Sequence, residues 1–416
     1  MALPHADWLY PGIGLKRWLL LAAAGALLLV YSLIVAAGVL WSHDLLRGLG
    51  LDWLVGRRYA AAVLAFDGIV AGGVALAVGA RRVWVWRRTN PETASEIRAS
   101  SRLARGLRVA AIGGGNGLAA LLSGLKTQTS NITAVVTMAD DGGSSGRLRR
   151  DMGLPPPGDI RNCLVALADD ESLMSRLFQY RFADGGLEGH SFGNLFVAAL
   201  AEVTGDFERA VQESTHVLKV RGRVLPSTLD DVVLHAQLEG GAQVSGESTI
   251  TAADRLPRRV WLTPEQPHAL PQAVEAVLHA DMVVLGPGSL YTSVVPNLLI
   301  PAVRDALKRT RAWVVYVCNV MTQPGETDGY TAADHLEALY RHGVAGMVDV
   351  VLVNDSPVSG ELALVYERVG AAPVAVDEAR LKTMGVRVAR APLAKTGDVV
   401  RHDPGALTDA LLRILH

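Results

Sequence analysis

Two long apolar segments near the N-terminus constrain this chain more than any other feature of its sequence. Residues 18–41 carry no charged side chain, and residues 59–80 carry only Asp67. Each run matches the ~20 apolar residues that a helix needs to cross the hydrocarbon core of a bilayer. Trp18 and Trp41 stand at the ends of the first run, where tryptophan anchors helices at membrane surfaces. The pattern predicts a membrane hairpin within residues 1–86.

Other interpretations of these two runs are open. A cleaved signal peptide would have a shorter apolar core that ends at a small-residue cleavage site. A buried helix of a soluble domain is the alternative for the second run. A charged Asp67 would be energetically costly near the middle of a membrane, which suggests a function. The alternative is that Asp67 has no function and is either protonated or packed against a partner helix.

Arginine distribution predicts the orientation of the hairpin. Only Glu92 and Glu96 oppose the arginines that follow the second run. Because positive charge collects on the cytoplasmic side, the main domain and the N-terminus are expected in the cytoplasm of a cell-membrane protein. Arg47, Arg57 and Arg58 in the connecting loop weaken this asymmetry. The following arginines are Arg81, Arg82, Arg87, Arg88, Arg98, Arg102, Arg105 and Arg108.

Residues 87–106 are polar, contain Pro91 and are predicted to form a basic linker that also suits anionic lipid headgroups. Over the whole chain the net charge is −1, so composition gives no support for nucleic-acid binding. The two cysteines, Cys163 and Cys318, lie far apart in apolar runs. They suit a reducing compartment and provide no zinc or disulfide framework.

Residues 107–416 have the pattern of a doubly wound α/β domain. Short apolar runs with no polar alternation are typical of parallel strands that are buried on both faces. Helical stretches such as 302–309 and 332–340 lie between them. Residues 232–262 alternate around Gly240-Gly241 and predict a β-hairpin insertion. The predicted strands are 107–112, 132–138, 281–286, 312–319 and 349–355.

A glycine-rich turn follows the first predicted strand. Gly115, Gly117 and Ala120 have the G-x-G-x-x-A spacing of loops that bring a helix N-terminus close to a phosphate. A packing turn without a ligand is the alternative. The predicted binding residues of this turn are Gly113, Gly114, Gly115, Asn116 and Gly117.

The second strand ends in the stretch ADDGGSSGRLRRD. Asp140 and Asp141 are candidates either for ribose hydroxyls or for a divalent cation beside phosphates. The segment is predicted to cradle an anion through backbone N–H groups, hydroxyls and one guanidinium. Its other predicted binding residues are Gly142, Gly143, Ser144, Ser145 and Arg147, whereas Arg149, Arg150 and Asp151 are expected on a solvated or ion-paired helix face.

Two further segments place polar residues at expected helix starts. Asp159, Arg161 and Asn162 follow three prolines, and a simple capping role for Asp159 is an equal alternative. His190 and Asn194 precede another apolar helix, for which Ser191 is a candidate cap.

Polar loops also follow two later strands. Because the carboxyl ends of parallel strands meet at one edge of a sheet, all these loops are expected around a single ligand crevice. The predicted binding residues here are Gly286, Gly288, Ser289, Tyr291, Thr292, Asn319, Thr322, Gln323, Glu326 and Thr327.

Taken together, GGGNG, MADDGGSSGRL, PPPGDIRNCLVAL, HSFGNL, GPGSLYTSV, NVMTQPGET and VRHDP resemble the gluconeogenesis factor family of the YvcK type. This family is related to the 2-phospho-L-lactate transferases, the CofD-like proteins. The resemblance extends over residues 107–416 in collinear order and excludes the hairpin. Asn116 departs from the threonine common at that position but keeps a polar side chain in the turn.

The resemblance implies a Rossmann-like domain that binds a UDP-sugar such as UDP-N-acetylglucosamine, with a role in cell shape, wall synthesis and growth on gluconeogenic carbon sources. The related transferases imply magnesium-dependent transfer of a phospholactyl group from a guanylylated donor. Two late residues are added to the predicted site by residue type. Tyr366 is expected to stack on uracil or to lie in the core, and Arg401 to meet a diphosphate or to pair with Asp403.

The loops show no obvious nucleophile–base pair, which favours binding over covalent catalysis. Our leading hypothesis is a membrane-anchored UDP-sugar sensor that needs no cofactor and acts on protein partners of envelope synthesis. The second is a transferase in which Asp140 and Asp141 hold magnesium. A weaker third, an NAD-dependent oxidoreductase, rests on the first loop alone. The sequence leaves open whether the protein forms a homo-oligomer.

Overall fold

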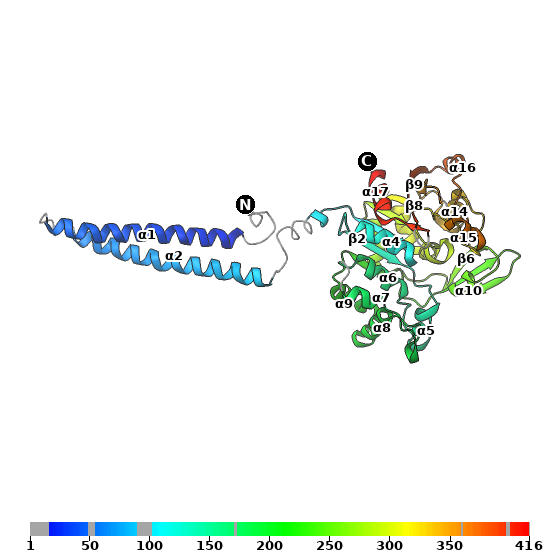
Figure 1. The fold of residues 1–416 in the computed structure, drawn as a ribbon, viewed down its shortest axis with the longest axis horizontal. Coiled ribbons are helices and arrows are strands. Elements are labelled where there is room, and N and C mark those ends of the chain that lie inside the picture. The colour runs from blue at the N-terminus through cyan, green and yellow to red at the C-terminus, as the bar shows by residue number, and fades with distance from the viewer. Residues whose placement is uncertain are drawn as a thin grey trace. The chain divides into compact units, whose positions relative to one another are not determined.

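The structure is a computed structural model that describes residues 16–48, 55–89, 102–169, 173–358, 361–396 and 400–415. The chain divides into two compact units, Met1–Arg102 and Leu103–His416. The second unit begins slightly before the predicted residue 107, because Leu103 is buried and its carbonyl accepts hydrogen bonds from Gly106 and Ser130. Figure 1 draws both units as ribbons.

The first unit is a pair of helices, α1 (Lys16–Gly48) and α2 (Val55–Thr89). Both extend beyond the predicted bounds of 18–41 and 59–80, since helix formation continues into the flanking polar residues. The segments Arg17–Ala37 and Ala62–Val85 are long and apolar enough to cross a membrane. Glycines let the helices approach closely: a Cβ on Gly72 would lie 2.7 Å from the carbonyl oxygen of Gly25.

The second unit is built on a seven-stranded parallel sheet in the order β10-β9-β8-β7-β1-β2-β3. All five predicted strands are confirmed, and β1 and β2 are fully buried, as expected for strands covered on both faces. The two edge strands, β3 and β10, were not predicted, because each carries an exposed arginine. The strands are β1 (Val109–Gly113), β2 (Ile132–Val136), β3 (Arg223–Pro226), β7 (Met282–Leu285), β8 (Trp313–Val317), β9 (Val350–Asn354) and β10 (Arg387–Ala391).

Helices cover both faces of this sheet. On one face α4 packs against α6 and α17; on the other α11 packs against α13. The predicted helices 302–309 and 332–340 are confirmed as α13 and α14. The main helices are α4 (Gly115–Leu125), α5 (Gly143–Met152), α6 (Gly158–Leu167), α7 (Leu173–Gln179), α8 (Phe192–Thr204), α9 (Phe207–Leu218), α11 (Pro271–Leu278), α13 (Pro301–Arg309), α14 (Ala332–Leu339), α15 (Glu361–Arg368), α16 (Glu378–Thr383) and α17 (Pro404–Ile414).

The predicted β-hairpin insertion is confirmed as part of a three-stranded antiparallel sheet. Strand β4 (Val233–Leu238) pairs with β5 (Gln243–Ser245) and with β6 (Pro257–Thr263), and the short helix α10 (Glu247–Thr251) follows β5. In Figure 1 this insertion, marked by β6 and α10, projects from one end of the sheet.

The sheet also defines where a ligand crevice belongs. The chain runs outward from β1 through β2 to β3, and then outward in the other direction from β7 to β10. The connections after β1 and β7 therefore leave the sheet on opposite sides, which opens a crevice at the carboxyl ends of these two neighbouring strands. Both are followed by predicted glycine loops.

Candidate functional site

The first glycine loop begins α4 at the carboxyl end of β1. Gly114 is extended and provides no side-chain cap, and Gly115 has a φ of 63°, a conformation that favours glycine. The backbone N–H of Gly115 donates to the Asp159 carboxylate. A side chain on Gly114 would collide with that carboxylate. The glycines are therefore required for the close approach of this loop to α6.

Asp159 is not the cap of α6, because the helix begins at Gly158 with Pro157 at the capping position. Instead its carboxylate faces the first glycine loop. Burial and the neighbouring charge of Asp140 raise the pKa of Asp159 to about 6. The alternative of a simple cap is thus wrong, and the geometry brings Asp159 into the candidate site.

The loop after β7 lies directly against the first glycine loop. A Cβ on Gly117 would lie 2.6 Å from the carbonyl oxygen of Pro287, and one on Gly288 would lie 3.2 Å from that of Gly114. The N–H of Gly288 donates weakly to Asn319 Oδ1 at 3.4 Å. Loops from β1, β7 and β8 therefore meet, as their positions in the sequence predict.

Several residues of the predicted site support the backbone of this loop from the protein interior, and their ligand contacts stay predictions. Glu326 is 1% exposed, and its Oε1 accepts from the backbone N–H groups of Tyr291 (2.7 Å) and Thr292 (3.1 Å). Burial raises the pKa of Glu326 to about 7. The Tyr291 ring is fully buried, with its hydroxyl bonded to Tyr330.

Thr322 and Thr327 in the later loops also have backbone partners. The Thr322 hydroxyl accepts from the N–H of Ala372, and the Thr327 hydroxyl from that of Gln323. Both threonines are buried. Gln323 in turn accepts a 2.7 Å bond from Ser289, which stands nearer the crevice. Sequence patterns predicted which loops meet at this edge of the sheet. They could not predict which side chains of these loops face the crevice and which face the protein interior.

The two adjacent aspartates after β2 have different partners. Asp140 Oδ1 accepts from Gly142 N–H, and its pKa is raised, mainly by burial. Asp141 Oδ1 accepts from the N–H of Ser248 at the start of α10. The Asp141 carboxylate is thus bound to the insertion, and of these two aspartates it is Asp140 that lines the crevice. Among the residues that the structure describes, no three His, Cys, Asp or Glu side chains form a group suited to a metal ion.

Four predicted residues form one hydrogen-bonded group at the start of α5. Asn194 Nδ2 contacts Ser144 Oγ at 3.1 Å and Ser145 Oγ at 3.5 Å, and Ser144 Oγ also lies 3.1 Å from His190 Nδ1. Burial and nearby arginines lower the pKa of His190, which favours the neutral ring. The Ser144–His190 contact is a hydroxyl–base pair that sequence reasoning did not detect, because the two residues come from separate segments.

The predicted arginines have distinct surroundings. Arg147 donates to the carbonyl oxygen of Glu188, and Arg161 donates to Asn162 Oδ1 at 2.8 Å while its Nε is buried without a partner. Arg149 forms an ion pair with Asp231, which confirms the expected ion-paired face.

Ser191 caps α8, confirming that expectation, because its side chain accepts from Asn194 N–H. Tyr366 is half-buried and its hydroxyl accepts from Val400 N–H. Arg401 is exposed on β12 (Val400–His402), whereas Asp403 caps α17. Ligand contacts of Tyr366 and Arg401 remain predictions.

Glu247, on α10 of the insertion, was missed by sequence reasoning. Burial, followed by the charges of Asp140 and Asp141, raises the pKa of Glu247 to about 7. Its sequence signal is weak, since it looks like one polar residue of an alternating hairpin. Only the folding of the insertion over the sheet edge brings it to the crevice.

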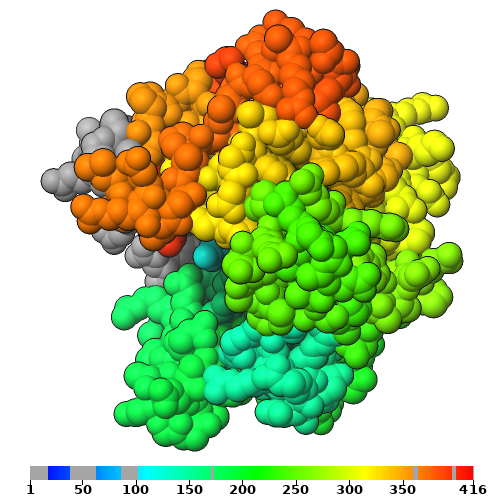
Figure 2. Space-filling view, turned by 90° about the vertical axis from the view of Figure 1, so that its right-hand side faces the viewer, coloured from blue at the N-terminus to red at the C-terminus, as the bar shows by residue number. Residues whose placement is uncertain are grey.

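These elements enclose a hollow of about 370 Å³ at the carboxyl edge of the sheet. Figure 2 shows the face on which the insertion (yellow-green) overhangs the turquoise segment of α5, with a hollow beside them. Three carboxylates and two glycine loops surround it. The lining residues are Gly114, Gly115, Asn116, Gly117, Thr137, Asp140, Asp159, Glu247, Gly288, Ser289, Thr292 and Ser293.

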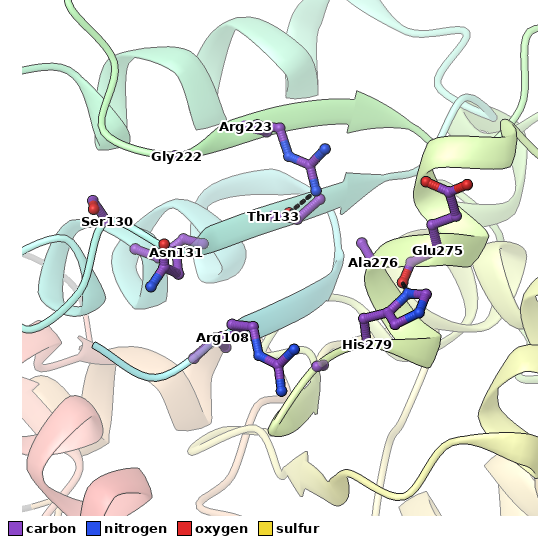
Figure 3. A pocket seen from close by; sticks show the side chains of 12 residues that line it. Arg108, Ser130, Asn131, Thr133, Gly222, Arg223, Glu275, Ala276 and His279 are labelled. Atoms are coloured by element: carbon purple, nitrogen blue, oxygen red, sulfur yellow. Dashed lines mark hydrogen bonds between the residues drawn. The ribbon is translucent and has the colours of Figure 1, made fainter. Parts of the chain in front are cut away.

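A larger hollow, of about 480 Å³, lies at the opposite, amino edge of the sheet (Figure 3). Its two arginines are already paired: Arg108 with Asp281, and Arg223 with Thr133 at 3.2 Å. We therefore assign the candidate site to the smaller hollow, where glycine loops and carboxylates converge. The class of protein that this defines is a Rossmann-like α/β protein with a ligand crevice at its topological switch point.

Comparison with known proteins specifies the family. Residues 109–394 match the family model described as 2-phospho-L-lactate transferase CofD. The chain is 45% identical to a putative gluconeogenesis factor of Nostoc over 98% of this chain and 91% of that one, and 50% identical to the gluconeogenesis factor of Bacillus subtilis over 74% and 98%. A crystal structure of a Bacillus halodurans protein matches with a TM-score of 0.72 and 50% identity, covering 74% of this chain and all of that one. The chain belongs to the CofD-like gluconeogenesis factor family.

Proposed function

We propose that this protein binds a UDP-sugar in the carboxyl-edge hollow and regulates envelope synthesis, cell shape and growth on gluconeogenic carbon sources. The observation that supports it most is the convergence of the loops after β1 and β7 with Asp140, Asp159 and Glu247 around one hollow. Backbone N–H groups at the start of α4 suit a diphosphate. The carboxylates suit the hydroxyls of ribose and sugar.

The two cysteines further favour a binding role over thiol catalysis. Neither cysteine is a usable nucleophile, because Cys163 and Cys318 are buried and burial raises the pKa of both thiols. The two apolar helices support the second part of the proposal, a membrane anchor that keeps the nucleotide-binding domain in the cytoplasm. Protein partners of envelope synthesis would then be reached at the membrane.

Calorimetric titration of residues 103–416 with UDP-N-acetylglucosamine tests the ligand. This fragment is a compact unit and corresponds to the whole chain of the Bacillus halodurans relative. Saturable binding that GTP and NAD do not displace is expected. Absence of binding, or stronger binding of GTP with magnesium, would overturn the proposal.

A transferase is the second candidate, favoured by the match to the transferase family model and by the Ser144–His190 contact. Asp140, and Asp159 or Glu247 beside it, are the oxygen donors that would hold Mg²⁺ near a diphosphate, where the ion would neutralise charge. Incubation with GTP- or UDP-linked donors and magnesium separates the two candidates. Steady nucleotide release by the wild type, lost in Asp140→Asn, would replace the sensor with the enzyme.

A further inference from the structure

Asp67 lies on the outer surface of the helix pair and away from the seam between its helices. Its side chain is exposed, whereas the seam is lined by the small residues Gly25, Gly68 and Gly72 together with Ser32. Within the described residues, Asp67 makes no hydrogen bond or ion pair. A carboxylate facing hydrocarbon is unfavourable, and such residues in membrane helices almost always meet a polar partner.

Tyr31 is the complementary group on the other helix. It is 67% exposed and its hydroxyl has no hydrogen-bond partner among the described residues. A side chain on Gly68 would collide with Ser32, so these two residues lie side by side in the seam. Tyr31 directly precedes Ser32, and Asp67 directly precedes Gly68. Because the helices are antiparallel, Tyr31 and Asp67 differ in depth along the helix axes by the rise of about two residues, ~3 Å.

The two side chains also lie on the same broad face of the hairpin. Successive residues of a helix are rotated by about 100° around its axis. Tyr31 is therefore rotated by roughly 140° around the α1 axis, and Asp67 by roughly 130° around the α2 axis, away from the side that faces the other helix. Since the helices run in opposite directions, these rotations carry both side chains to the same side. Leu28 and Ala71, both exposed, point straight out of this face between them. We call this surface the Tyr31–Asp67 face.

We infer that the Tyr31–Asp67 face is the contact surface for a second copy of this chain, which rests on the membrane anchorage proposed above. Copies inserted in the same direction are related by a two-fold axis along the membrane normal, so every residue keeps its depth. Face-to-face contact places α1 of one copy on α2 of the other. The Tyr31 hydroxyl of each copy then donates a hydrogen bond to the Asp67 carboxylate of the other copy. The two-fold symmetry gives two such bonds, so both tyrosines and both aspartates have a partner.

Disulfide cross-linking of the full chain in membranes tests this contact. Differently tagged copies carrying Leu28→Cys and Ala71→Cys are co-expressed and oxidised. We expect a disulfide that joins two differently tagged copies through the introduced cysteines. The native Cys163 and Cys318 are buried and will not react. The matched control pair, Val30→Cys with Ile69→Cys, lies within about 3 Å of that depth on the opposite face and should give no cross-link.

The proposed hydrogen bond is tested in the same cross-linking pair. Asp67→Leu and Tyr31→Phe should each lower the cross-linked fraction at least about fivefold, and the two together should lower it no further, as expected for partners in one interaction. An unchanged fraction in Asp67→Leu, or equal cross-linking of the control pair, would overturn the inference. Release of the protein by alkaline extraction would overturn the membrane anchor itself. Retention without cross-linking would overturn only the self-association.

Discussion

Two hollows of the α/β domain lie at opposite edges of the same sheet and differ in the surroundings of their polar groups. At the amino edge, Arg108 and Asn131 have partners within the protein, and so does Arg223, whose bond to Thr133 is drawn in Figure 3. At the carboxyl edge, the carboxylates of Asp140, Asp159 and Glu247 line one hollow, and burial together with the charges of the neighbouring aspartates raises the pKa of Glu247 to about 7.

This difference shows that size is a poor guide to function in this fold. In the larger hollow Arg108, Arg223 and Asn131 have partners within the protein, so we expect these residues to stabilise the sheet. The smaller one holds charge that the protein leaves uncompensated, which is typical of binding and catalytic sites. The following changes test this contrast.

The largest effect is expected from Gly114→Val. The new side chain would collide with Asp159 and approach Thr137 Cγ2, so the first glycine loop must move away from α6. UDP-sugar affinity, measured by calorimetry, should fall by roughly 100-fold, about 2.7 kcal/mol. Gly186→Val, which meets open space, is the matched control and should bind normally. Unchanged affinity in Gly114→Val with a wild-type melting curve would exclude this loop from the site.

Asn131→Ala should affect stability alone. Its Nδ2 donates to the carbonyl oxygens of Ala104 and Gly106 at 3.0 and 2.7 Å, so it fixes the first residues of the domain to the amino edge. Loss of these bonds should lower the free energy of unfolding by about 1–2 kcal/mol, measured with urea. Ligand affinity should stay the same. A weaker ligand interaction would mean that the amino-edge hollow takes part in binding.

Glu247→Gln should strengthen binding in the absence of divalent cations. One of three like charges beside the proposed diphosphate is removed, and an effect of roughly fivefold is expected. Glu239→Gln is the matched control on the same insertion, because Glu239 pairs with Arg258 instead of facing the hollow. A loss of affinity in Glu247→Gln alone would show instead that its carboxylate accepts a hydrogen bond from the ligand.

A separate prediction concerns the dependence of stability on pH. Glu326 has a pKa of about 7 in the folded protein against an ordinary value of 4.5, so the folded state binds more protons between these values. Stability contributed by this group is therefore lost as pH rises from ~4.5 to ~7. Glu326→Gln should flatten that decline in urea titrations at several pH values. An identical slope in the variant would assign the pH dependence to other groups.

Much of the site was predictable because its loops are continuous in sequence. The spacing of Gly115 and Gly117 and the acids after β2 identified two of the converging segments, and strand order brought them together as expected. Side-chain direction was not predictable. Tyr291, Thr322, Glu326 and Thr327 appeared equivalent to their neighbours, yet they turn inward and support the loop backbone.

The sequence by itself determined the two apolar helices, the parallel sheet and the edge of that sheet on which a ligand is expected. These follow from local composition and periodicity, which need no knowledge of distant contacts. Only the tertiary structure decided that Glu247 reaches the crevice and that Ser144 contacts His190. It also decided that Asp140 lines the crevice while Asp141 binds the backbone of Ser248. Each of these depends on how separate elements pack, because the positions of side chains from distant segments are fixed only when the intervening core is filled.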